Sequence, residues 1–281
     1  MNRVLVILAF LAAGILAVGQ PLRAQITVST SGQYSSGDYI FAEDTQVFGW
    51  TNSLTVRSGR IRLGVSVPFV VQSDPWITYT GAGMTPSGGP RYSRLVRDRR
   101  GQHGGRRVPI ALPDSISGPT TGLGDPQFSA AIDLISRTPA DMGAEVTVAV
   151  KPPIADADGG FSTGSWDGGV GLRLSRSFMP WFILAEGTYW WLGDLDDVPL
   201  NDGIAYSVAV GQTLFDGRWG VLGSLNGSTT VIDGVDAPLS INGGLSYMPG
   251  QWAVNATAGS GLTEGAANWS FGIGASFTFR N

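Results

Sequence analysis

The stretch that decides the fold is Trp269–Arg280, which reads WSFGIGASFTFR. Successive side chains of a β-strand point to opposite faces, so a period of two separates the residues of this stretch into two sets. One face is bulky and apolar, with Trp269, Phe271, Ile273, Ala275, Phe277 and Phe279. The other face is small and polar, with Ser270, Gly272, Gly274, Ser276 and Thr278. A soluble sandwich would bury the bulky face against a second sheet, whereas a membrane barrel turns it to lipid and lines a wet lumen with the small residues.

The rest of the chain repeats this pattern in segments long enough to cross a bilayer at a tilt. The predicted strands are 27–35, 44–57, 60–72, 126–136, 143–151, 166–177, 181–192, 204–215, 218–228, 239–248, 251–260 and 269–280. The connections between them alternate between short turns and long loops, as in outer-membrane proteins. An open sheet edge in lipid would leave backbone groups unpaired, so the sheet has to close. We therefore predict an all-β fold, a closed antiparallel transmembrane β-barrel of about twelve strands, with short periplasmic turns and long extracellular loops.

The first residues indicate export. Arg3 precedes an apolar run over 4–18, and small and polar residues follow as far as Ala24. This pattern is typical of a secretory signal peptide. We expect a signal peptide over 1–24 and a single barrel domain over 25–281, located in the bacterial outer membrane.

Composition narrows the function classes. The chain has a formal net charge of −4, which offers nucleic acid no general attraction. It has no cysteine and one histidine, and it shows no zinc cluster, P-loop or dinucleotide fingerprint. We expect no cofactor and no enzyme activity, since a serine hydrolase would need a base and His103 lies in a loop. The expected partners are membrane lipid, lipopolysaccharide, a small-molecule solute and the barrel-assembly machinery during insertion.

Charged residues gather on the predicted inner face of the strands between 44 and 192. They are Arg57, Arg62, Asp133, Glu145, Lys151, Asp167, Arg173 and Glu186. The later strands present mainly small residues to the lumen, so the interior has one charged wall and one smooth wall. Two interpretations stay open: a selectivity wall along a solute path, or a salt-bridged wall that only braces the barrel.

The loop over about 73–121 is unusually long, which is typical of a functional or disordered segment. It is rich in basic residues, namely Arg91, Arg94, Arg97, Arg99, Arg100, His103, Arg106 and Arg107. One hypothesis is an extracellular lid or inward plug, a gate that presents positive charge to an anionic solute or to lipopolysaccharide phosphates. The alternative is a solvated, mobile loop. The other long loops are acidic, for which surface solvation is the plain explanation.

Three short motifs resemble an outer-membrane family named for a MetA pathway of phenol degradation. They are Gly122-Leu123-Gly124-Asp125, Lys151-Pro152 and Ser162-Thr163-Gly164-Ser165-Trp166-Asp167. The chain departs from the family pattern at Ser162 and Thr163, which replace the usual Gly-Thr opening, and at Pro153, where threonine is usual. The resemblance covers the chain from about residue 121 onward. It implies a transporter-like barrel for hydrophobic or aromatic compounds and assigns no catalytic residue.

The first of these motifs also has a local interpretation. Gly122 and Gly124 are expected to let the chain bend at the barrel rim, and Asp125 to cap that turn through its own backbone. Together the sequence favours a passive channel for small solutes. The alternative is a structural or adhesion barrel with a closed lumen, whose outer loops bind a partner.

Overall fold

The computed structural model describes residues 24–89, 118–135, 142–195 and 198–280. The predicted signal peptide therefore lies almost entirely outside the described residues, as do all eight basic side chains of the predicted gate loop. Within the described part of the chain, no helix is long and apolar enough to cross a membrane.

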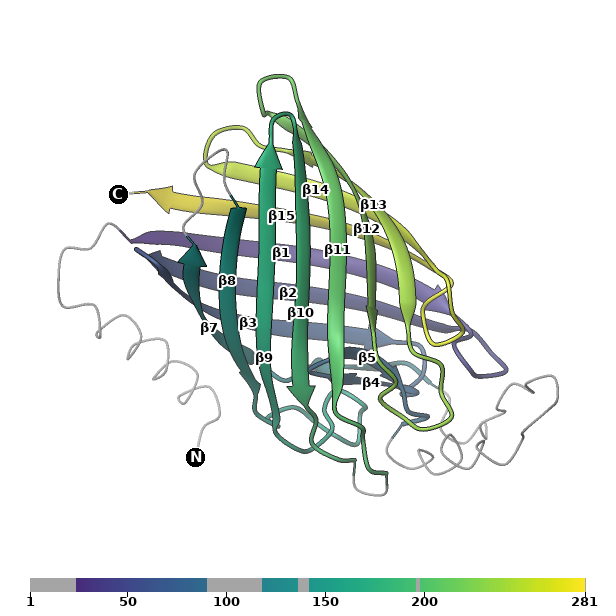
Figure 1. Ribbon diagram of the computed structural model, residues 1–281. Coiled ribbons are helices and arrows are strands. Elements are labelled where there is room, and N and C mark those ends of the chain that lie inside the picture. Colours follow the sequence, from purple (N-terminus) through teal and green to yellow (C-terminus); the bar gives the residue numbers. More distant parts are fainter. Residues whose placement is uncertain (1–23, 90–117, 136–141, 196–197, 281) are drawn as a thin grey trace.

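Twelve long strands form one closed antiparallel barrel (Figure 1). They are β1 (Gln25–Gly37), β2 (Thr45–Ser58), β3 (Ile61–Gln72), β7 (Gln127–Ile135), β8 (Met142–Lys151), β9 (Asp167–Phe178), β10 (Trp181–Trp191), β11 (Gly203–Leu214), β12 (Trp219–Ser228), β13 (Leu239–Tyr247), β14 (Trp252–Gly261) and β15 (Trp269–Arg280). Neighbours in the chain pair with each other, and β1 also pairs with β15 from Gln25↔Arg280 to Ser36↔Trp269. This last pairing removes the free sheet edge, so the predicted closed barrel is confirmed.

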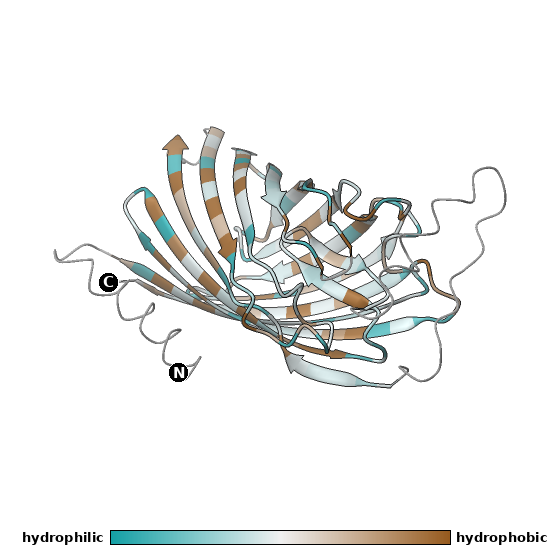
Figure 2. Ribbon diagram, turned by 90° about the horizontal axis from the view of Figure 1, so that it is seen from below, coloured by the Kyte–Doolittle hydropathy of each residue, from teal (hydrophilic) through white to brown (hydrophobic). Residues whose placement is uncertain are grey.

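The two faces of the barrel wall differ as the alternation predicts. Large apolar side chains of the long strands stand exposed on the outside; Ile273 is 66% and Phe271 57% exposed. Figure 2 shows the resulting succession of apolar and polar residues along the strands. Contact between water and so large an apolar surface around the barrel would be unfavourable. Such a surface is typical of a belt that faces lipid.

Aromatic pairs lie at both ends of this belt. Trp219 and Tyr247 have ring centroids 4.7 Å apart beside the short turns, and Tyr189 and Trp191 lie 5.1 Å apart at the opposite end. Rings with one polar edge are favoured at the two levels where lipid headgroups begin. The strand segments between these two aromatic levels therefore lie within the hydrocarbon layer.

The connections separate the two ends of the barrel. Short turns and the first and last strand residues lie at one end; the turn between β11 and β12 uses left-handed backbone at Asp216 (φ 57°) and Gly217 (φ 80°). The described parts of the longer connections lie at the other end, within 38–44, 73–126, 152–166, 192–202, 229–238 and 262–268. We refer to this second end as the mouth.

One long connection contains structure that the pattern analysis missed. The segment 73–125, expected to be a continuous loop, holds the hairpin strands β4 (Ile77–Thr80) and β5 (Gly83–Pro86) and the short strand β6 (Thr120–Leu123). The two hairpin strands pair only with each other, and they lie inside the mouth rather than in the barrel wall (Figure 1). We call residues 74–89 the plug hairpin.

The strand β6 continues the wall above β7. It pairs with Phe69–Gln72 of β3, while β7 pairs with the earlier half of that strand. The break between β6 and β7 falls at 124–126, where Gly124 N–H donates to Pro68 O over 2.8 Å and Pro126 has no N–H to donate. The motif predicted to be a rim turn thus separates β6 from β7, and both of these strands pair with β3.

Candidate functional site in the barrel lumen

Six charged side chains form one continuous network on the inner face of the wall. Arg57, Arg62, Asp133, Glu145, Arg173 and Glu186 come one each from β2, β3, β7, β8, β9 and β10. Three cations and three anions sum to zero, so the network presents dipoles rather than a net charge to the lumen. All six belong to the set predicted for the lumen wall.

Glu145 is the centre of this network. Its carboxylate is 8% exposed and contacts three guanidinium groups: Arg62, Arg57 at 3.4 Å and Arg173 at 3.9 Å. At the flanks, Arg57 Nη1 lies 2.6 Å from Asp133 Oδ2, and Arg173 Nη2 lies 2.7 Å from Glu186 Oε2. Multiple charge-assisted hydrogen bonds of this kind hold long side chains in fixed positions.

The register explains why the network has this shape. Asp133 lies directly opposite Glu145, and Arg57 directly opposite Arg62, so two direct cross-strand pairs join like charges. Like charges in that position are destabilising unless a neighbouring strand supplies the opposite sign. The salt bridges among these four residues therefore run diagonally and tie β2, β3, β7 and β8 together, whereas Arg173 lies directly opposite both Glu145 and Glu186.

The remaining two predicted lumen residues lie elsewhere. Lys151 and Asp167 are opposite each other at the mouth ends of β8 and β9, and both are buried beneath the mouth loops. Lys151 Nζ lies 2.7 Å from Asp125 Oδ2 and 3.2 Å from Asp167 Oδ2. This buried triad faces loop backbone rather than open lumen.

Asp125 has a different role from the one expected. Its Oδ1 accepts hydrogen bonds of 2.8 Å from the N–H groups of Ile154 and Ala155, in the loop that follows β8. It therefore fastens a neighbouring loop instead of its own turn. Gly122 likewise has no left-handed backbone; it leaves room for the Phe161 ring, which a Cβ at residue 122 would meet at 2.6 Å.

Asp167 connects the plug hairpin to the wall. Its Oδ2 accepts a hydrogen bond of 2.8 Å from Gly81 N–H at the hairpin tip, and its Oδ1 accepts one of 3.0 Å from Gly193 N–H. The Trp190 ring, on the inner face of β10, packs directly against Gly81 and occupies the space that any side chain there would need. One carboxylate thus joins β9, the hairpin and the loop after β10.

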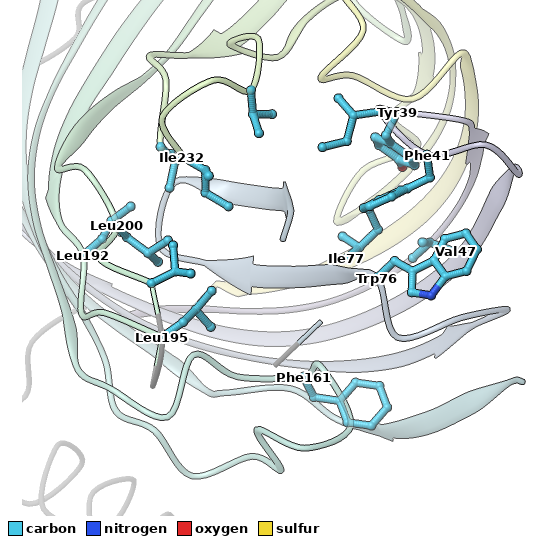
Figure 3. Close-up of a cluster of buried hydrophobic side chains, with 14 of the residues drawn as sticks. Tyr39, Phe41, Val47, Trp76, Ile77, Phe161, Leu192, Leu195, Leu200 and Ile232 are labelled. Atoms are coloured by element: carbon cyan, nitrogen blue, oxygen red, sulfur yellow. The ribbon is translucent and has the colours of Figure 1, made fainter. Parts of the chain in front are cut away.

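An apolar core fills much of the mouth around the hairpin. Buried residues from most of the long loops meet there, including Tyr39, Phe41, Trp76, Ile77, Phe161, Leu192, Leu195, Leu200, Val231 and Ile232. Figure 3 shows the hairpin lying across the opening, with Phe41 and Ile77 toward one side and Leu200 and Ile232 toward the other. The described part of the long loop therefore places apolar groups in the mouth, and the predicted basic gate residues lie outside the described residues.

The carboxylates of the acidic loops also hold backbone in place. Asp194 Oδ1 accepts from Leu200 N–H at 2.8 Å, and Asp202 Oδ1 accepts from Leu192 N–H at 3.0 Å. These bonds fold the loop 192–202 so that its leucines turn inward. Simple surface solvation does not describe these two residues.

Two phenols are buried in the mouth core. Burial raises the pKa of Tyr79 above its usual 10.0, and the neighbouring Tyr39 phenol raises it further. Burial also raises the pKa of Tyr39. Both groups are therefore neutral at physiological pH.

A cavity of about 560 Å³ remains beside the plug hairpin. One side of it is the inner face of β11–β15, with Ser207, Ser224, Asn226, Ser240, Asn242, Thr257 and Ser270; the other side includes Tyr39, Ala82 and Met84. The cavity thus lies along the smooth wall that was predicted from the small residues.

Some of these features had signals in the sequence. Tyr189, Trp190 and Trp191 are three consecutive aromatic residues, and period-two alternation requires one of them to point inward. The hairpin has its own short alternation around Gly81 and Gly83. The partners of Asp125 and Asp167 had no such signal, because they are backbone groups of loops distant in the chain.

Comparisons with known proteins agree with the fold. No family model matches the chain, and no curated protein matches it either. Among solved structures, the COG4313 outer membrane channel from Pseudomonas putida F1 aligns with a TM-score of 0.64 at 15% identity, covering 93% of this chain and 97% of that one.

Two further structures are less similar. The beta domain of the Bordetella autotransporter BrkA gives a TM-score of 0.45 at 14% identity, covering 92% of this chain and 100% of that one. Salmonella typhi OmpF gives 0.40 at 7% identity, covering 92% and 98%. At 15% identity, the likeness to the Pseudomonas putida channel shows the outer-membrane barrel fold alone.

Proposed function

We propose that this protein is an outer-membrane channel for the passive uptake of small solutes, with its mouth narrowed by the plug hairpin. The observation on which this depends is the cavity left between the hairpin and the inner wall of β11–β15. A barrel that served only as a rigid body would gain stability by filling that space with side chains. Here the wall beside it is kept small and polar instead.

The orientation and partners follow from the same proposal. The short turns lie in the periplasm and the mouth faces outward, as in other outer-membrane barrels. The outer belt contacts lipid, and insertion uses the barrel-assembly machinery. The arginines of the long loop, if they lie near the mouth, would meet lipopolysaccharide phosphates. The family resemblance adds hydrophobic or aromatic compounds as the solute class, and the apolar mouth core supports this class.

A second candidate is a closed structural or adhesion barrel. The apolar core around the hairpin favours it, because such a core resists the passage of water and ions. Planar-bilayer recording separates the two candidates. A channel gives unitary current steps when the purified protein inserts, and addition of permeant solute changes them. The control is protein reconstituted into vesicles, where protection from protease shows that the barrel has inserted. If such inserted protein gives no current in the planar bilayer, the channel proposal is overturned.

A further inference from the structure

The cavity beside the plug hairpin has two chemically different sides. The side formed by β11–β13 presents hydroxyl and carboxamide groups, with Ser207, Asn226 and Asn242 among them. The opposite side presents Met84 and Ala82 of the hairpin together with Tyr39. A volume of about 560 Å³ lies within the range of pockets that enclose small molecules.

The polar side is held in a fixed arrangement. Ser207 Oγ donates to Asn226 Oδ1 over 2.6 Å, and Asn226 Nδ2 donates to Ser224 Oγ over 3.1 Å. Asn242 Nδ2 donates to Ser240 Oγ over 3.2 Å in the same way on the next strand. Each carboxamide has two donor hydrogens and two lone pairs, so these contacts leave further hydrogen-bonding capacity on residues that line the cavity. The wall can therefore bind hydroxyl or amide groups without rearranging.

The cavity lining has little charge. Among the described residues, Glu186 is the only acidic or basic group that lines it, and its Oε2 already accepts a hydrogen bond of 2.8 Å from Arg173 Nε. An ion entering the cavity would lose hydration and gain no opposite charge in return, which is costly. The lining therefore disfavours ionic solutes and accepts neutral ones.

The apolar side is also positioned deliberately by the backbone. Tyr39 has a φ of 51°, a strained left-handed conformation that is rare for a bulky residue. The turn is closed by a 2.7 Å hydrogen bond from Phe41 N–H to Asp38 O. Strain of this kind persists only where surrounding contacts impose it, and here it fixes the Tyr39 ring between the mouth core and the cavity.

From these observations we infer that the cavity binds an uncharged amphipathic solute of one or two rings, with hydroxyl or amide groups on one face and an apolar opposite face. The polar face would lie on the Asn226 and Asn242 side, and the ring on the Met84 side. This inference rests on the proposed channel function, of which it names the solute class.

The test uses three probes that separate charge from shape. Phenyl β-D-glucoside has a hydroxylated ring and an apolar ring; phenyl β-D-glucuronide adds a carboxylate; glucose lacks the apolar ring. Calorimetric titration of the detergent-solubilised barrel measures binding, and block of single-channel current measures the same contact during passage. We expect phenyl glucoside to bind at least 10-fold more tightly than either of the others. Equal binding of the glucuronide, or no binding of the glucoside, would overturn the inference.

Variants locate the contact. Asn226→Ala with Asn242→Ala should weaken glucoside binding about 10-fold or more, on the scale of two lost hydrogen bonds. The matched control is Asn255→Ala, an asparagine of the inner face that lies outside the cavity lining. Met84→Ser tests the other wall without altering a barrel strand and should weaken binding by about 5-fold. Unchanged affinity in both the asparagine and Met84 variants would overturn the assignment.

The two proposals fail in different ways. Current that no probe blocks, together with an absence of calorimetric binding, would leave the channel and remove the solute site. Glucoside binding that is lost in the asparagine variant, in a protein that passes no current, would support the site and remove the channel.

Discussion

The carboxylate of Asp167, at the start of β9, accepts a hydrogen bond of 2.8 Å from the backbone N–H of Gly81, at the tip of the plug hairpin. These residues are 86 positions apart in the chain. The same carboxylate lies 3.2 Å from Lys151 Nζ and is completely buried. A charged group of the barrel wall therefore helps to hold the hairpin in the mouth.

Replacing that group should release the hairpin. Asp167→Asn keeps the size of the side chain, but a carboxamide oxygen cannot replace both carboxylate oxygens, and Lys151 loses one of its two partners. Asp125 still compensates Lys151, so the cost is that of a weakened charge-assisted hydrogen bond, about 1.5–3 kcal/mol. We expect larger unitary conductance or a higher open fraction in planar bilayers. Asp158→Asn, an exposed carboxyl in the preceding loop, is the control; equal currents for both variants would argue against the anchoring role.

Crowding the hairpin tip should have a similar effect through a different contact. In Gly81→Ala the new methyl group would overlap the Trp190 ring, and overpacking of this kind costs about 1–3 kcal/mol. We expect higher conductance and faster cleavage of the hairpin by an added protease. Adding Trp190→Leu should bring both values back toward wild type. If Trp190→Leu made no difference to the Gly81→Ala channel, the ring would not be what holds the tip.

The charged network allows its two interpretations to be separated. Glu145→Gln removes the shared partner of Arg57, Arg62 and Arg173 and leaves one positive charge in excess. If the network is a selectivity wall, the reversal potential of the Glu145→Gln channel in a KCl gradient should shift in the direction of greater anion selectivity. If the network only braces the barrel, the Glu145→Gln variant should unfold at a lower temperature, as detected by the mobility of heated samples on a gel, with no change in ion selectivity. Lack of either effect would mean that the network serves neither role.

The buried phenols predict an alkaline transition of the mouth. Burial raises the pKa of Tyr79, so the ionised phenolate is disfavoured while the hairpin is docked. The stability of docking is fully present below the usual tyrosine pKa of 10.0 and is lost as the pH rises through the higher folded value. Conductance measured from pH 7 to 11 should rise only above about 10. Tyr79→Phe should weaken that rise, and an identical rise in this variant would rule out Tyr79 as its cause.

The barrel could be predicted from the sequence because lipid and lumen impose a period of two on every wall strand. Each long strand was located to within a few residues, and Ile273 and Ser270 face opposite sides as their types suggest. The face of each wall residue follows from local alternation, which can be read from a single sequence. Arg62 and Glu145 could be assigned to the inner face because the apolar residues beside them in the chain alternate with them and face outward.

The mouth could not be predicted in this way, because its contacts are not periodic. Ile77, the first residue of β4, is fully buried, and most of the residues around it come from loops far along the chain. Asp125 and Asp167 bind backbone N–H groups, which are present at nearly every position and leave no pattern of side chains. The eight basic residues between 91 and 107 lie outside the described residues, so their role as a gate stays a prediction.

The most direct test of the account is to label its solute path. The chain has no cysteine, so a single introduced thiol is the only reactive one. Ser207 lines the cavity, whereas Val208, the next residue, is exposed on the outer face. A small, uncharged thiol reagent that reacts only with hydrated thiols, added to open channels, should lower the current of Ser207→Cys and leave that of Val208→Cys unchanged. A Ser207→Cys channel whose current does not respond, or equal responses in both, would contradict a water-filled path along β11–β15.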